Sequence, residues 1–274
     1  MSGTFFVIGT PIGNLDDITI RQLDTLRAVD FICAEDTRVT LKLLNRFEIK
    51  KQLISFHEHS SKADAQRIID RLLAGESCGI VTDAGMPCIS DPGEVLVKMC
   101  AESGIDIKVV PGPSAVVSAV AVSGLSTRRF TFEGFLPVPK KERAERLEKL
   151  RGETAVMVFY EAPHKLKTTL ADLSEFFSGD RRISLCRELT KIHEEVLRLT
   201  LAEAVEYYSV NEPKGEFVLV LEGAQESAEG ELTIEEAMAQ VRKLIDMGEK
   251  PTEACKAVAK ETGFRKSELY AQLT

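Results

Sequence analysis

The chain lacks any apolar run of the roughly 18–20 residues that a membrane-spanning helix needs, so no transmembrane segment is expected. Its first ten residues, MSGTFFVIGT, contain no basic stretch followed by an apolar one, so no secretion signal is expected either. The six cysteines are scattered and form no CxxC pair. This pattern favours buried, reduced thiols in a cytoplasmic protein over a disulfide framework.

The sequence also lacks internal repeats and low-complexity tracts. Its 274 residues, 44% hydrophobic and 28% charged, are typical of a soluble globular protein with one large or two modest domains. The net charge of −8 argues against a generic binder of polyanions. Nucleic acid is not excluded, because a local basic patch is sufficient for binding it.

Short apolar segments alternate with amphipathic ones through the first 124 residues. Runs of Val, Ile and Phe between helices predict an α/β domain whose parallel sheet is covered on both faces. We expect strands at 5–10, 31–35, 78–83 and 105–112, and helices at 17–29, 37–47, 61–75 and 93–104.

A second α/β domain is expected over residues 125–223, with part of its sheet mixed because one strand runs directly into a helix. Its strands are predicted at 130–136, 154–162, 182–189, 194–201 and 216–223, and two of its helices at 140–151 and 163–177. The polar segment 223–231 is typical of a linker. A helical extension over 232–274 follows, with helices predicted at 233–247, 251–263 and 266–272.

Four loops that follow strands contain glycine and proline, carboxylates, or both. In α/β sheets, ligands bind at the carboxyl ends of the strands. The loops are GTPIGN (9–14), AEDTR (34–38), TDAGMPCISDPG (82–93) and VPGPSA (110–115).

A nicotinamide dinucleotide is a poor match to these loops. The GxGxxG pattern is absent, Pro11 removes an N–H group where a pyrophosphate needs one, and no GxxxxGK[ST] motif occurs. A ligand with a ribose, a zwitterion and a cation fits better, because carboxylates accept hydroxyl and ammonium hydrogens and prolines preorganise the turns. S-adenosylmethionine has these groups.

Simpler interpretations of the same segments stay open. Asp91 could cap a helix whose first residue is Pro92, which explains the end of the third loop but not its beginning. The segment FHEHSS offers two histidines without an evident third ligand, so no metal site is expected, and Ser60 or Ser61 is a candidate helix cap. The charges of RELTKIHEE either pair with one another or face a cleft.

Eight segments, in order from about residue 4 to 223, resemble the tetrapyrrole-methylase superfamily, and within it the branch that methylates the ribose 2′-oxygen of a cytidine in small-subunit ribosomal RNA. They are VIGTPIGNLDDIT, AEDTR, FHEH, VTDAGMPCISDPG, VVPGPSA, FYEAPHK, RELTKIHEE and KGEFVLVLEG. The C-terminal helices resemble the extra segment of that branch less specifically. The resemblance implies two α/β domains with S-adenosylmethionine in the cleft between them, and a homodimer.

The resemblance also implies which residues contact the cofactor. They are Pro11, Ile12 and Gly13 in the first loop, Asp83, Ala84, Gly85, Pro87, Ile89, Ser90 and Asp91 in the third, Ser114 and Ala115 in the fourth, and Tyr160, Ala162, Leu189, Gly215, Glu216 and Phe217 in the second domain.

A ribose hydroxyl is a poor nucleophile, so a positioned proton acceptor should assist its attack. Ionisable candidates are Glu161, His164, Glu188 and Lys191, of which Glu188 is favoured, and Lys191 could act only if burial lowered its pKa. Arg187 cannot act as a base but could hold a phosphate of the RNA.

The best basic stretch for the RNA backbone contains Arg128, Arg129, Lys140 and Lys141. A tetrapyrrole methylase of the same fold is the first alternative. A ligand-sensing nucleic-acid-binding regulator built on the C-terminal helices is an alternative of another class.

Overall fold

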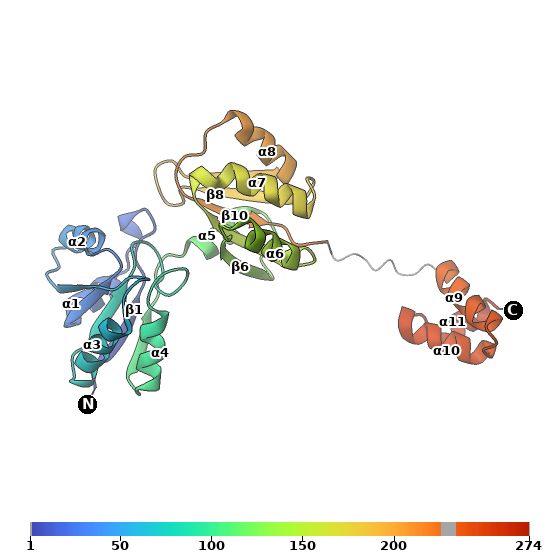
Figure 1. Cartoon of the computed structure of the whole chain (residues 1–274), viewed down its shortest axis with the longest axis horizontal. Coiled ribbons are helices and arrows are strands. Elements are labelled where there is room, and N and C mark those ends of the chain that lie inside the picture. The colour runs from blue at the N-terminus through green and yellow to red at the C-terminus, as the bar shows by residue number, and fades with distance from the viewer. Residues whose placement is uncertain (1, 226–233, 274) are drawn as a thin grey trace. The chain divides into compact units, whose positions relative to one another are not determined.

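The computed structural model describes residues 2–225 and 234–273, so most of the expected linker, residues 226–231, lies outside the described residues. The chain forms two compact units, Met1–Glu222 and Gly223–Thr274. The first contains two five-stranded sheets and the second contains three helices (Figure 1). No helix within the described ranges is both long enough and apolar enough to cross a bilayer.

The first sheet is fully parallel, with the strand order β3-β2-β4-β1-β5. One face packs on α3 and α4 and the other on α1 and α2, which confirms the predicted α/β layers. The elements are β1 (Thr4–Ile8), η1 (Leu15–Asp17), α1 (Ile20–Ala28), β2 (Phe31–Ala34), α2 (Thr37–Arg46), β3 (Gln52–Ser55), α3 (Lys62–Leu73), β4 (Cys78–Val81), α4 (Glu94–Glu102) and β5 (Asp106–Val110).

The sequence did not predict strand β3. Its four residues, QLIS, form an edge strand in which the first and last residues are exposed and the middle two are half-buried. β3 is as long as the central strands β2 and β4, but it lacks their continuous apolar run, all of whose residues are buried.

The second sheet is mixed, as predicted, with the order β6-β7-β10-β8-β9. Strands β6 and β7 pair in parallel, and the other neighbours are antiparallel. The elements are α5 (Ala115–Ser123), β6 (Phe130–Phe135), α6 (Lys140–Leu150), β7 (Val156–Glu161), α7 (Pro163–Phe177), β8 (Arg182–Arg187), β9 (Glu195–Thr200), α8 (Leu201–Val210) and β10 (Phe217–Leu221).

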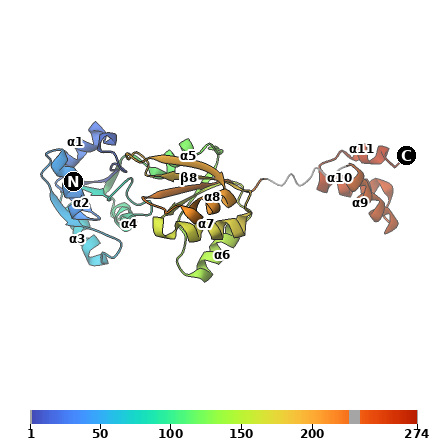
Figure 2. The ribbon, with the colours of Figure 1, turned by 90° about the horizontal axis from the view of Figure 1, so that it is seen from above.

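Helix α5 belongs to the first 124 residues but packs on the second sheet. Val116, Ala119 and Val120 join a buried cluster with residues of β7, β8 and β10, and Ile12 from the first loop belongs to the same cluster. Figure 2 shows α5 on one side of this sheet and α6 and α7 on the other. Helix α5 and Ile12 of the first strand-end loop therefore complete a hydrophobic core on the second sheet, while the strands of the first sheet bury their own clusters.

Side-chain caps fix where several helices begin. Thr19, Ser61 and Thr200 each accept a backbone N–H in a capping box, so the predicted Ser61 cap is confirmed. The predicted Asp91 cap is wrong, because α4 begins at Glu94 after Gly93, which has φ of 128° and no side-chain cap. The Asp91 carboxylate is thus not used to start the helix.

The C-terminal unit contains α9 (Ile234–Asp246), α10 (Pro251–Thr262) and α11 (Lys266–Ala271), close to the three predicted segments. They bury their own cluster, which includes Val241, Cys255, Val258 and Leu269. This small core follows the apolar periodicity of the three helices.

Candidate active site

Backbone hydrogen bonds tie the strand-end loops of the first sheet to one another. Thr10 and Gly85 form a two-way bridge, N to O at 2.8 Å and 3.2 Å. The N–H of Gly9 donates to the carbonyl of Val110 at 3.0 Å, and the N–H of Gly112 to the Sδ of Met86 at 3.3 Å. The first, third and fourth loops therefore form one fixed surface at the carboxyl ends of β1, β4 and β5.

Carboxylates of the second and third loops meet at this surface. The Asp83 Oδ1 accepts from the N–H of Asp36 at 3.2 Å, and the Glu35 Oε2 accepts from the N–H of Asp83 at 3.4 Å. Burial, followed by repulsion from neighbouring carboxylates, raises the pKa of both Glu35 and Asp83. Such a cluster favours a cationic ligand, which would relieve the repulsion.

Asp91 is the most perturbed acid of the site. Burial, together with the charges of Glu35 and Asp83, raises its pKa to about 7. Within residues 2–225 and 234–273 its carboxyl has no hydrogen-bond or ion-pair partner. A partly buried carboxyl without a partner is costly when ionised, and this is typical of a binding site.

Left-handed backbone at non-glycine residues occurs in the third loop and in the segment RELTK, where the predicted strand 182–189 ends at Arg187 instead of Leu189. Cys88 and Ser90 have φ of 71° and 61° in the third loop, and Glu188 and Thr190 have φ of 52° and 66° in the segment RELTK. Each such residue costs free energy, so surrounding contacts must hold it in place. Both loops are thus rigid, as the prolines of the third loop already indicated.

The first loop packs directly on RELTK. A Cβ at Gly13 would lie 2.5 Å from the Cγ of Lys191 and 2.9 Å from the Oγ1 of Thr190. Only glycine permits this approach of the two loops. RELTK, which joins β8 to β9, is thereby held against the end of β1.

Glu188, Lys191 and Glu216 form an ion-pair network at this contact. The Lys191 Nζ lies 2.9 Å from Glu188 Oε1 and 2.8 Å from Glu216 Oε2. The hydrogen bond from Lys191 lowers the pKa of Glu188. Burial of Lys191 acts to lower its own pKa, but the two carboxylates outweigh burial and raise it. Lys191 is therefore an ammonium at neutral pH, which removes the condition under which it could act as a base.

Oε1 of Glu188 also accepts a hydrogen bond from the backbone N–H of Glu216 at 2.9 Å. The Lys191 ammonium and this N–H therefore donate to the same oxygen of Glu188. The other oxygen, Oε2, has no partner in the described part of the chain. Gly215, with φ of 85°, faces the Glu188 side chain so closely that a Cβ would lie 2.5 Å from its Cγ. Gly215 and Glu216 thus position Glu188.

The other three catalytic candidates either lie away from this network or already bond to other residues. Arg187 donates to Glu195 across the β8–β9 pair at 3.0 Å. Glu161 is buried and accepts from Thr169 and, at 2.9 Å, from the N–H of Ala162. His164 lies on the exposed side of α7, in a pocket between α6 and α7. None of these three joins the Glu188 network.

Tyr160 brings an aromatic group to the third loop. Its ring packs edge-on against Phe132 at 4.9 Å and tilted against Phe135 at 5.5 Å. Burial, followed by the charge of Asp91, raises the pKa of Tyr160 to about 12. Since Phe135 is 57% exposed at the end of β6, it offers an apolar surface near the acids. The sequence argument did not select Phe135, although an aromatic residue at a strand end is a usable signal.

Three cavities adjoin these loops, and two of them contain residues predicted to contact the cofactor. One of about 620 Å³ is lined by Ser90, Asp91, Glu35 and Phe135, among others. One of about 200 Å³ contains Pro11 and Asp83, and one of about 410 Å³ contains Pro113 and Thr190. Leu189 and Phe217 are buried in the hydrophobic clusters instead, where they support the loops.

Orphaned hydroxyl groups mark places where a polar ligand fits. The Oγ1 atoms of Thr40, Thr82 and Thr190 are buried without a hydrogen-bond partner among the described residues. Thr40 and Thr82 line the cavity that contains Asp83, and Thr190 lines the one beside the fourth loop. Unpaired hydroxyls beside carboxylates suit the ribose and ammonium groups of S-adenosylmethionine.

The predicted basic stretch is only partly unpaired. Arg129 pairs with Glu153 at 3.3 Å and Lys141 with Glu145 at 4.0 Å. Arg128 and Lys140 have no ion-pair partner in residues 2–225 or 234–273. The free positive charge is therefore smaller than the sequence indicates.

Comparison with known proteins places this arrangement in a family. Residues 4–205 match the family model for tetrapyrrole (corrin/porphyrin) methylases. A relative in Halalkalibacterium halodurans, the "Ribosomal RNA small subunit methyltransferase I", is 45% identical over 98% of this chain and 93% of its own length. The protein of that name in Thermotoga maritima is 50% identical over 223 residues, which are 81% of this chain and its own full length.

Among solved structures, the uroporphyrin-III-C-methyltransferase of Thermus thermophilus is similar with a TM-score of 0.56. The match covers 80% of this chain and 94% of that one at 19% identity, so it supports the fold alone. The expected resemblance is confirmed at the level of the family: the chain is a member of the tetrapyrrole methylases.

Proposed function

We propose that this chain transfers the methyl group of S-adenosylmethionine to the ribose 2′-hydroxyl of a cytidine in small-subunit ribosomal RNA, in the cytoplasm and as a homodimer. The observation that carries the proposal is the 45% identity, over 98% of the chain, to a relative named for small-subunit ribosomal RNA methylation. The rigid loops, the unpaired hydroxyls and the carboxylates with raised pKa support a site for the cofactor.

The proposed cofactor site uses the residues that the resemblance selects. Asp83 and Asp91 would face the cationic and hydroxyl groups, while Pro11, Pro87 and the strained Ser90 keep the loops in one conformation. A flexible zwitterion loses conformational freedom on binding, and a preorganised site reduces that cost. Tyr160 and Ala162 would close the site from the end of β7.

When bound, S-adenosylmethionine supplies a methyl group whose bond to sulfur breaks as its bond to the ribose oxygen forms. The protein's tasks are to align the hydroxyl with that group and to exclude water. It must also accept the hydroxyl proton. Since Oε2 of Glu188 is free while Oε1 is held by Lys191 and Glu216, we assign this proton to Oε2. Its lowered pKa makes Glu188 a weak base, so its contribution should lie at the lower end of the usual 10²–10⁴-fold, about 10²-fold.

The proposed homodimer would need an apolar surface on the first unit. Val109 on the edge strand β5 and Val117 on α5 are 55% and 59% exposed, which supports an interface there. Edge strands with exposed valines are otherwise a liability in water. Sedimentation of the parent and of a Val109→Lys/Val117→Lys variant tests this, and an unchanged sedimentation coefficient would place the interface elsewhere.

The two alternatives have weaker support. The tetrapyrrole methylase alternative rests on structures under 25% identical, which share the fold only. The regulator alternative requires the C-terminal helices, yet the Thermotoga relative with the methyltransferase name matches over only 223 residues, about the length of Met1–Glu222. Incubation with methyl-labelled S-adenosylmethionine and small ribosomal subunits separates the proposal from both alternatives. Label in RNA supports the proposal, whereas cofactor binding without transfer to RNA supports one of the alternatives.

A further inference from the structure

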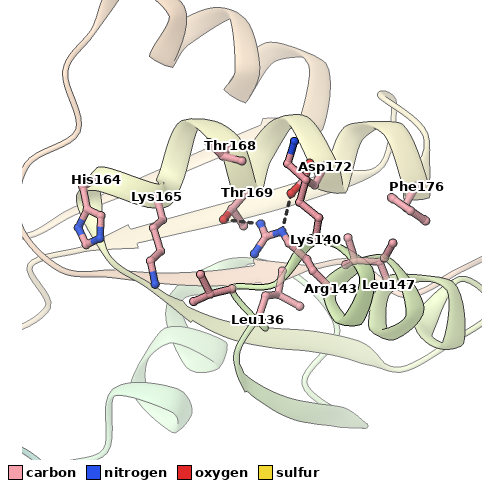
Figure 3. Close-up of a pocket in the computed structure, with 12 residues that line it drawn as sticks. Leu136, Lys140, Arg143, Leu147, His164, Lys165, Thr168, Thr169, Asp172 and Phe176 are labelled. Atoms are coloured by element: carbon pink, nitrogen blue, oxygen red, sulfur yellow. Dashed lines mark hydrogen bonds and ion pairs between the residues drawn. The ribbon is translucent and has the colours of Figure 1, made fainter.

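A fourth cavity, also of about 410 Å³, lies between α6 and α7 and contains none of the residues expected to contact the cofactor (Figure 3). Its apolar part is formed by Leu136, Leu147 and Phe176. Lys140 and Lys165 line it as well, and neither makes an ion pair within residues 2–225 and 234–273. Two ammonium groups without ion-pair partners among the described residues thus lie beside an apolar surface.

Arg143 adds a fixed donor to this pocket. Its Nε donates to Asp172 Oδ2 at 2.5 Å and its Nη2 to Thr169 Oγ1 at 2.7 Å. Figure 3 shows both bonds and a third guanidinium nitrogen that makes no contact drawn there. Because the first two nitrogens are held, the third is preorganised to donate to an acceptor in the pocket.

A chain of hydrogen bonds joins the pocket to the proposed cofactor wall. Thr169, held by Arg143, donates to Glu161 Oε2, and Glu161 Oε1 accepts the N–H of Ala162 at 2.9 Å. Ala162 follows the end of β7, beside Tyr160. These hydrogen bonds satisfy both carboxyl oxygens of the buried Glu161, and they connect the pocket to the end of β7.

We propose that this pocket receives a nucleotide of the RNA substrate that neighbours the target, with its base on the apolar part and its phosphate on Lys140 and Lys165. The inference rests on the proposed function and names a contact of the same substrate. Apolar surface matches the face of a base, and unpaired lysines match a phosphate. An acidic protein needs such a local cationic site to overcome its repulsion of a polyanion.

The test compares two double variants of the full chain with the same change of charge. Lys140→Glu/Lys165→Glu alters the pocket. Lys149→Glu/Lys167→Glu, on the same two helices, alters residues that do not line it. Filter binding to small ribosomal subunits is measured at several salt concentrations. The pocket variant should bind about 10-fold or more weakly, with a salt slope smaller by about 0.7 per lost phosphate contact. The control variant should lose much less, and calorimetry should show unchanged cofactor affinity in both.

A third variant, Ala144→Trp, fills the pocket without changing its charge. It should weaken filter binding to subunits and leave the salt slope unaltered, with circular dichroism confirming the fold. Equal losses in the two double variants, or parental affinity for subunits in Ala144→Trp, would overturn the proposal. An acidic peptide that binds in this pocket and is not displaced by small-subunit RNA would also overturn the proposal. If the parent binds subunits yet transfers no methyl group, the proposed function fails separately, because these binding measurements need no catalysis.

Discussion

The acid cluster predicts an unusual pH dependence of stability, centred on Asp91. Its pKa rises from 3.8 in the unfolded chain to about 7 in the folded one, so between these values the folded protein binds a proton that the unfolded chain has released. The contribution of Asp91 to the free energy of unfolding therefore falls as pH rises from about 4 to about 7 and levels off above. The direction is opposite to that of a carboxylate stabilised by an ion pair.

The magnitude follows from the same shift. Without solvent screening, a difference of about 3 in pKa corresponds to a change of about 4 kcal/mol in the free energy of unfolding. Because Asp91 remains partly exposed, solvent screens its interactions, and we expect about 1–2 kcal/mol. Asp91→Asn keeps the shape and cannot ionise. The variant should not lose this free energy as pH rises. The unfolding free energy of the variant minus that of the parent should therefore increase by about 1–2 kcal/mol from pH 4.5 to pH 8.

Urea unfolding followed by circular dichroism at the two pH values measures this difference. Asp24→Asn is the control, because Asp24 is 66% exposed in a surface ion pair and should follow the parent. Subtraction of parent and variant removes the contribution of all other titrating groups. If Asp91→Asn and the parent lose the same free energy, the carboxyl is ionised without penalty and the argument for a strained acid cluster is refuted.

Three further perturbations address the loops. Asp83→Ala should weaken binding of S-adenosylmethionine by about 1–3 kcal/mol in calorimetry, and an unchanged affinity would remove Asp83 from the site. Glu188→Gln should lower kcat for subunit methylation by about 10²-fold with intact cofactor binding, and a kcat within a few-fold of the parent excludes it as the proton acceptor. Gly13→Ala places a methyl group against Lys191 and Thr190, so it should lower both kcat and Tm, and parental values would show that the two loops do not touch.

The layers of the fold were predictable because local patterns decide them. Buried strands such as β2 and β4 consist of continuous apolar residues, and Ser61 marks the start of α3 through a capping box. The short edge strand β3 carries too little apolar pattern to be found. The start of α4 agrees with the predicted helix over 93–104, whereas the alternative start with Asp91 as cap is wrong. The left-handed Cys88 and Ser90 turn the chain before Gly93, and a sequence does not reveal such strain.

The candidate site was predictable only in part. Parallel strands bring their carboxyl-end loops together, so the meeting of Asp83 with Glu35 follows from topology. Glu188 and Lys191 pair within the RELTK motif, three positions apart, as one interpretation of its charges allowed. Glu216 lies 25 positions from Lys191 and 28 from Glu188, so its part in the network cannot be read from the motif. The placement of α5 on the second sheet is likewise a long-range property.

Mapping the product of methyl transfer tests the central claim most directly. Small ribosomal subunits that lack the modification are incubated with the protein and methyl-labelled S-adenosylmethionine, and the RNA is then digested and analysed by mass spectrometry. The account predicts label on one cytidine, on the ribose, with the adjoining phosphodiester resistant to alkali because its 2′-hydroxyl is blocked. Label on a base, or none in RNA from a protein that binds the cofactor, would contradict it.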